Sequence, residues 1–109
     1  MEHVNVGARD DEWTVLASTS RSQAAVMTIE PGGKEGGPSN RHEGADQWLY
    51  VISGRGTATI AGKMVRLGPG SLLLVEAGER HEIENDGTEP LKTINVYAPP
   101  EYDASGSDS

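Results

Sequence analysis

Residues 40–54 read NRHEGADQWLYVISG, and residues 70–85 read GSLLLVEAGERHEIEN. Each stretch places a histidine beside an apolar run that is rich in β-forming residues and bounded by glycine. If paired strands bring His42, Gln47 and His81 to one cavity, their nitrogen and amide oxygen atoms form a neutral ligand set for a divalent metal. The two stretches together predict a metal site inside a small β-barrel.

Turn residues recur at short intervals along the chain, which contains 14 glycines and 6 prolines. Short apolar runs lie between the turns, and no segment repeats its apolar residues with the period of a helix. Many short strands with regular turn signals are typical of an all-β sandwich or barrel. We expect strands near residues 13–18, 24–30, 41–43, 47–53, 56–61, 63–67, 72–76, 80–85 and 91–97.

Turns and loops define the expected domain. Ala61-Gly62 and Asn85-Asp86-Gly87 suit tight turns between strands. Residues 31–40 contain so much glycine and proline that we expect a loop. The glycine-rich part of this loop lacks the Lys-Ser/Thr ending and the following helix of a phosphate-binding loop, so we assign no cofactor-binding residues other than metal ligands. We predict one barrel domain over residues 1–100 and a disordered acidic tail over residues 101–109.

Composition excludes several classes of function. The 109 residues include no cysteine, which excludes disulfides, thiolate metal sites and a cysteine nucleophile. The formal net charge is −8 and the basic residues form no stripe, so we expect no binding to nucleic acid or to an anionic membrane surface. The first residues lack a leader pattern and no apolar run is long enough to span a bilayer, so we expect a cytoplasmic protein.

The first stretch resembles a motif of the cupin superfamily of small β-barrels. That motif contains His-x-His, three or four residues, a glutamate, six residues and a closing glycine. If Gly54 is the closing glycine, Gln47 stands at the glutamate position. Counting back further places His42 and Asn40 at the two histidine positions.

The second stretch resembles the second cupin motif. That motif is Gly, five residues, Pro-x-Gly, two residues, His, three residues and Asn. The matching residues are Gly70, Gly78, His81 and Asn85, while Glu76 replaces the proline. The resemblance implies an all-β fold of the double-stranded β-helix type, also called a jelly roll or cupin barrel, with one cavity.

The resemblance also implies a ligand set of His42, Gln47 and His81, with Asn40 in or beside the shell. Cupins usually use three histidines and a glutamate, and two of these four ligands are kept here. Some cupins that process sugar acids carry glutamine at this position and bind metal through its carbonyl oxygen. Asp46 is a rival ligand, because strand alternation places it on the face of His42 unless the chain bends between them. The expected cofactor is one divalent transition metal, which would be Fe, Mn, Ni or Zn.

A neutral ligand set leaves the charge of a divalent ion uncompensated, which suits a polar or anionic substrate. We therefore expect a metal-dependent enzyme that acts on a small oxygen-rich molecule, such as a keto acid, a uronate or a sugar-like compound. The chemistry would be isomerisation, a lyase-type reaction or dioxygenation. Candidates for proton transfer are Glu43, Tyr50 and Tyr97. One alternative is a non-catalytic barrel that binds a sugar or another small molecule, and a second is a barrel whose degraded site binds no metal.

Two apolar runs predict more apolar surface than one small barrel interior needs. Trp48–Ile52 and Leu72–Val75 carry apolar residues on both of their alternating faces. One face is expected to pack against a second sheet or against another subunit. The cupin resemblance implies that the assembly is a homodimer.

Overall fold

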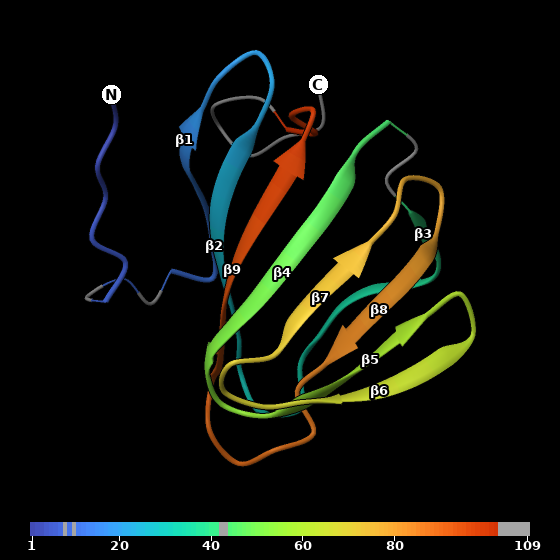
Figure 1. Ribbon diagram of the computed structural model, residues 1–109. Helices are drawn as coiled ribbons and strands as arrows, with labels where there is room; N and C mark the ends of the chain where they lie inside the picture. Colours follow the sequence, from blue (N-terminus) through green and yellow to red (C-terminus); the bar gives the residue numbers. More distant parts are fainter. Residues whose placement is uncertain (8, 10, 42–43, 103–109) are drawn as a thin grey trace.

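Two antiparallel sheets face each other and enclose the core of the molecule (Figure 1). The computed structural model describes residues 1–7, 9, 11–41 and 44–102, with residues 37–41 described by their backbone alone. The five-stranded sheet has the order β1-β2-β9-β4-β7, and the four-stranded sheet has the order β3-β8-β5-β6. Within these residues no helix is long and apolar enough to cross a membrane. The predicted all-β class is confirmed.

The strands follow the expected positions closely, with one exception. They are β1 (Trp13–Ser18), β2 (Gln23–Ile29), β3 (Lys34–Arg41), β4 (Asp46–Ser53), β5 (Gly56–Ile60), β6 (Lys63–Leu67), β7 (Leu72–Val75), β8 (Arg80–Glu84) and β9 (Leu91–Ala98). Burial alternates along β4, β8 and β9, because successive side chains of a strand point to opposite faces of its sheet.

The exception is β3, which replaces most of the loop expected over residues 31–40. β3 pairs antiparallel with β8, so that Gly36 lies opposite Glu82 and Gly37 opposite His81. The expectation was wrong because glycine and proline only weaken a strand, glycine through its backbone freedom and proline through its missing N–H donor, and pairing with β8 outweighs this effect here. β3 is also an edge strand, where Pro38 is tolerated.

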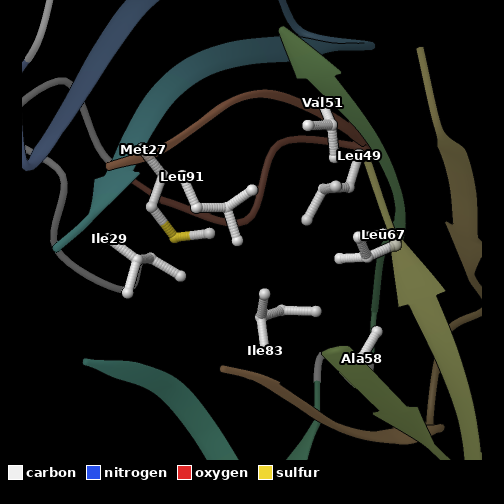
Figure 2. Packing of buried hydrophobic residues seen from close by; sticks show 8 residues of the cluster. All are labelled: Met27, Ile29, Leu49, Val51, Ala58, Leu67, Ile83 and Leu91. Atoms are coloured by element: carbon white, nitrogen blue, oxygen red, sulfur yellow. The ribbon is translucent and has the colours of Figure 1, made fainter. Parts of the chain in front are cut away.

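The main core lies between the two sheets (Figure 2). Its buried members come from both sheets and are Met27, Ile29, Leu49, Val51, Ala58, Leu67, Ile83 and Leu91. Burial of one such large apolar side chain contributes roughly 1.5–3 kcal/mol. This cluster therefore holds the sheets face to face and fixes which side of each strand points inward.

The predicted turns are confirmed by their backbone and side-chain geometry. Ala61 and Gly62 both have positive φ, 49° and 83°, as a two-residue hairpin turn between β5 and β6 requires. Asn85 accepts a hydrogen bond from the Gly87 amide at 2.9 Å through Oδ1. Its Nδ2 donates to the Ile29 and Glu89 carbonyls, both at 2.8 Å, so the side chain closes the turn that leads to β9.

Tyr102 packs against the five-stranded sheet. The Tyr102 ring lies edge-on to Trp13 and Tyr97, with ring centroids 5.0 and 5.1 Å away. Gln23 donates from Nε2 to the Tyr102 carbonyl at 2.6 Å, and its Oε1 accepts from the Tyr102 amide at 3.0 Å. We call Trp13, Gln23, Tyr97 and Tyr102 the C-terminal clasp, which fixes the end of the described chain to the five-stranded sheet.

Candidate metal centre

The strand register brings Gln47 and His81 to the same end of the two-sheet sandwich. Gln47 lies opposite Val75, which is the last residue of β7. His81 is the second residue of β8, and only residues 76–79 separate β7 from β8. The strand that carries Gln47 and the strand that carries His81 therefore meet at this short connection, which passes from one sheet to the other (Figure 1).

At the start of β4 the interior-facing residue is Gln47, and its rival Asp46 faces outward. Gln47 is 3% exposed. Asp46 is exposed, and its Oδ1 accepts a hydrogen bond from the Ala77 amide at 2.9 Å. Asp46 thus ties β4 to the connection between β7 and β8, while Gln47 presents its amide to the interior.

The amide of Gln47 has one satisfied end and one unsatisfied end. Nε2 donates to Oδ1 of Asn95 at 2.9 Å. Oε1 is buried and has no hydrogen-bond partner among the residues that the structure describes. A buried acceptor without a partner costs about 1–3 kcal/mol, and such atoms commonly mark a place where an ion or ligand binds. A divalent cation fits this oxygen.

His81 is buried and supplies an imidazole at the same end of the sandwich. Its Nδ1 lies 3.5 Å from the Glu79 carbonyl oxygen, at the long end of the hydrogen-bonding range. Nδ1 therefore faces the connection before β8. Neutral imidazole nitrogen is a good ligand for Mn, Fe, Ni and Zn, so the donor set fits the expected class of metal.

One of the two remaining expected ligands, Asn40, lies on the neighbouring edge strand. Asn40 lies in β3 between Gly37, which pairs with His81, and Arg41, which pairs with Arg80. The backbone of Asn40 is therefore at the end of the sandwich that carries His81. His42 and Glu43 lie outside the described residues. Among the described residues, no three His, Cys, Asp or Glu side chains gather in a metal-binding cluster, so Gln47 and His81 form the described part of the site.

A cavity of about 570 Å³ adjoins this site. It is lined by Thr59, Ala61, Gly62, Gly78, Glu79, Arg80, His81 and Glu82. Pockets that hold small molecules have volumes of roughly 300–1,000 Å³. Because His81 is one of its lining residues, a small molecule in this cavity would lie beside the imidazole.

Neither of the two described candidates for proton transfer lines that cavity. Tyr50 is 46% exposed and lies on the outer face of the five-stranded sheet, in register with Leu72. Tyr97 is buried, and burial raises its pKa well above the ordinary value for tyrosine, with a further rise from its interactions with Tyr102. Tyr97 therefore stays protonated and serves as a neutral hydrogen-bonding group.

Two buried polar residues behind Gln47 were not predicted from the sequence. Thr93 and Asn95 have no exposed surface and point inward from β9. Hydrophobic alternation would instead place Ile94 and Val96 inside, because these are the more apolar residues of the strand. The sequence therefore carries no signal for them, because a strand that buries Thr and Asn uses them for hydrogen bonds rather than for packing.

Comparisons with known proteins support the fold described above. The cupin domain family matches residues 25–97. The chain is 34% identical over 73 residues to the tetracenomycin polyketide synthase protein TcmJ of Streptomyces glaucescens, covering 67% of this chain and 48% of that protein. It is 33% identical over 72 residues to the oxalate-binding protein of Thermotoga maritima, covering 66% of this chain and 58% of that protein. The chain thus spans about half the length of these relatives.

Solved structures share the same architecture. A protein of Bacillus halodurans superposes with a TM-score of 0.86 at 24% identity, over 95% of this chain and 85% of that chain, and shows the fold alone. A predicted oxalate decarboxylase of Thermotoga maritima has a TM-score of 0.73 at 28% identity, over 81% of this chain and 79% of that chain. KdgF of a Halomonas species has a TM-score of 0.72 at 26% identity, over 81% and 77%. The predicted double-stranded β-helix is confirmed.

Proposed function

The chain belongs to the cupin family, and on this premise we propose that it binds one divalent transition metal and acts through it on a small oxygen-rich molecule. The proposed ligands are His42, Gln47 and His81, with Asn40 in or beside the shell. The observation that carries the proposal is the buried Oε1 atom of Gln47, which has no hydrogen-bond partner among the described residues. When bound, the metal would supply a Lewis acid that polarises a carbonyl or carboxylate oxygen of the substrate.

The cavity beside His81 supports a substrate that carries a carboxylate, such as a keto acid or a uronate. Arg80 lines this cavity, and a guanidinium can bind a carboxylate with two parallel hydrogen bonds. Glu79 and Glu82 also line it, so the cavity wall carries charged groups of both signs beside its apolar surface. A relative and a solved structure, both from Thermotoga maritima, carry names that refer to oxalate, a small dicarboxylate, which supports the same substrate class.

Catalysis would be isomerisation, a lyase-type reaction or dioxygenation, and proton transfer in the first two requires a titratable side chain. With Tyr50 on the outer face and Tyr97 held protonated, Glu43 is the remaining candidate for the catalytic base. The second candidate function is non-catalytic binding of the same class of molecule. It is favoured by Tyr50, which lies on the outer face, and by the relative that is named an oxalate-binding protein.

Elemental analysis of the natively purified protein is the first test of the proposal. We expect about one equivalent of Fe, Mn, Ni or Zn per chain when purification avoids chelators and affinity metals, because two histidines and one amide oxygen suffice to retain such an ion. The matched sample is the same protein after dialysis against EDTA. Equal, near-zero metal contents in the two samples would refute the metal proposal and leave the barrel with a degraded site.

Enzyme and binder are separated by incubating the metal-loaded protein with a panel of keto acids, uronates and oxalate. An enzyme converts at least one compound, whereas a binder returns all of them unchanged while calorimetry shows saturable binding. Glu43→Gln is the matched variant. We expect it to abolish turnover by an isomerase or lyase while it leaves ligand affinity nearly unchanged.

We also propose that two copies of the chain associate through the outer face of the five-stranded sheet. In this sheet Trp48 lies opposite Leu74 and Val96, and Tyr50 lies opposite Leu72 and Ile94. We call these six residues the outer apolar patch. Trp48, Tyr50, Leu72 and Leu74 are 43, 46, 62 and 37% exposed.

The size and chemistry of the patch favour a second copy as its occupant. The four exposed side chains present on the order of 400 Å² of apolar surface, about half of what each partner contributes to a standard interface, and its rim can supply the rest. The other sheet differs, because it carries ion pairs such as Lys34–Glu84 at 3.9 Å. An uncharged aromatic patch suits a two-fold interface, in which each copy contributes the same surface.

Leu72→Lys is expected to dissociate this dimer, because it places an ammonium group within the apolar contact. Sedimentation should show a dimer for the wild type at micromolar concentration and a monomer for the variant, with dimer affinity reduced at least about tenfold. Met64→Lys is the matched control, since Met64 is 74% exposed on the four-stranded sheet. A monomeric wild type, or equal effects of the two lysines, would remove the proposed interface.

A further inference from the structure

Gln47 is the first of three buried side chains that are joined by hydrogen bonds. Gln47 Nε2 donates to Asn95 Oδ1 at 2.9 Å, and Asn95 Nδ2 donates to Thr93 Oγ1 at 3.0 Å. Thr93 Oγ1 donates in turn to the Met27 carbonyl at 2.9 Å. Gln47, Asn95 and Thr93 are all buried, so the series of hydrogen bonds runs entirely inside the five-stranded sheet.

The direction of this series is set by its last member. The Met27 backbone carbonyl can only accept, so the Thr93 hydroxyl must donate to it. The Thr93 oxygen then accepts from the Asn95 amide nitrogen, which turns the Asn95 oxygen toward Gln47. The Asn95 oxygen can only accept, so its hydrogen bond comes from the nitrogen end of the Gln47 amide. The oxygen end of Gln47 is consequently the end that is left for a ligand.

We propose that Thr93 and Asn95 are positioning residues that fix the Gln47 amide with its oxygen toward the metal site. The claim that a metal takes this oxygen rests on the proposed function. Without the relay from Thr93 through Asn95, the Gln47 amide could rotate and present its NH₂ group, which repels a cation. The relay thus makes a glutamine, which can face a ligand with either end, act as an oxygen ligand only.

The relay also predicts how a carboxylate at position 47 would behave. Both oxygens of a carboxylate accept hydrogen bonds, so Gln47→Glu needs no orientation to present an oxygen to a cation. Asn95 would have to rotate its amide to donate to the carboxylate. Metal binding by a Gln47→Glu protein should therefore be tighter through the added charge and should no longer depend on Thr93.

The test is a double-mutant cycle of Thr93→Val with Gln47→Glu, read out as Zn²⁺ affinity by calorimetry and as thermal unfolding. We expect Thr93→Val to weaken Zn²⁺ binding about tenfold in the wild-type background, within the range for substitutions behind a metal ligand. In the Gln47→Glu background we expect less than about a twofold change, while the loss of thermal stability is similar in both. Thr93→Ser keeps the hydroxyl and should restore wild-type affinity.

A neutron structure of the metal-free protein tests the orientation without any metal. Deuterons on Gln47 Nε2 that point at Asn95 Oδ1 support the relay, and deuterons on Asn95 Nδ2 that point at Gln47 overturn it. Equal losses of Zn²⁺ affinity in both backgrounds would also overturn it, because Thr93 would then have only a structural role. If the deuterons lie as expected but the wild type binds no Zn²⁺, the orientation stands and the proposed metal function fails.

Discussion

Replacement of Gly54 by alanine is expected to destabilise the protein by more than about 3 kcal/mol, a large part of the roughly 5–15 kcal/mol that stabilises an ordinary domain. Gly54 has φ of +88°, a left-handed conformation that costs a residue with a Cβ about 1–2 kcal/mol. A Cβ there would also overlap the Pro90 carbonyl and lie 2.8 Å from the Leu91 Cα. Relief would require moving Leu91, which is fully buried in the main core.

Gly70→Ala is the matched control for this prediction. Gly70 has φ of +90°, but among the described residues no atom lies within 4 Å of the position that a Cβ would take. Its cost is therefore the backbone conformation alone, about 1–2 kcal/mol. Urea denaturation measures both variants, with unchanged m-values as the check that the unfolding transition is still two-state. Similar shifts of the urea midpoint for the two variants would show that the overlap with Pro90 adds nothing to the loss of stability in Gly54→Ala.

Replacement of His81 by alanine is expected to remove the metal from the protein. The site would lose one of its two proposed imidazole ligands, and because substitutions behind a ligand alone cost up to about 100-fold in affinity, loss of a direct ligand should cost more. Metal content, measured after dialysis against metal-free buffer, should fall from about one equivalent per chain to near zero. The cavity beside His81 should also lose its affinity for carboxylate ligands, since these would bind partly through the metal.

Two control variants test whether the loss of metal is specific to His81, because they remove another histidine and a nearby carboxylate. His3 is exposed and matches neither motif, so His3→Ala should keep the full metal content. Asp46→Asn should keep it as well, because Asp46 is bonded to the Ala77 amide outside the interior. Wild-type metal content in His81→Ala, or loss of metal in Asp46→Asn, would show that the ligand assignment is wrong.

Most of the fold could be predicted from the sequence because turns and strands are local. Ala61-Gly62 needs two residues with positive φ, and this requirement is visible in the residue types. The strand over residues 34–41 could not be predicted in the same way, since its stability comes from pairing with β8 and not from its own side chains. Pairing partners lie far apart in the sequence, and glycine and proline give no signal for them.

The candidate site was predictable only in part, for a related reason. The choice between Asp46 and Gln47 depends on the direction in which the chain enters β4, and a single residue of register exchanges the two faces of a strand. In the structure Gln47 faces the interior and Asp46 faces outward. The hydrogen bonds from Thr93 through Asn95 to Gln47 could not be predicted. Asn95 and Gln47 are 48 residues apart in the sequence, and residue types alone do not indicate that two such distant side chains are bonded.

The fluorescence of each of the two tryptophans should respond to a different event in this molecule. Trp13 is part of the C-terminal clasp, 5.0 Å from the Tyr102 ring between centroids, so its emission should respond when that segment detaches. Trp48 lies 43% exposed in the outer apolar patch, so its emission should shift to the blue when water leaves that face. A single-tryptophan variant of each kind would turn intrinsic fluorescence into a label-free assay, one for closure of the barrel end and one for association.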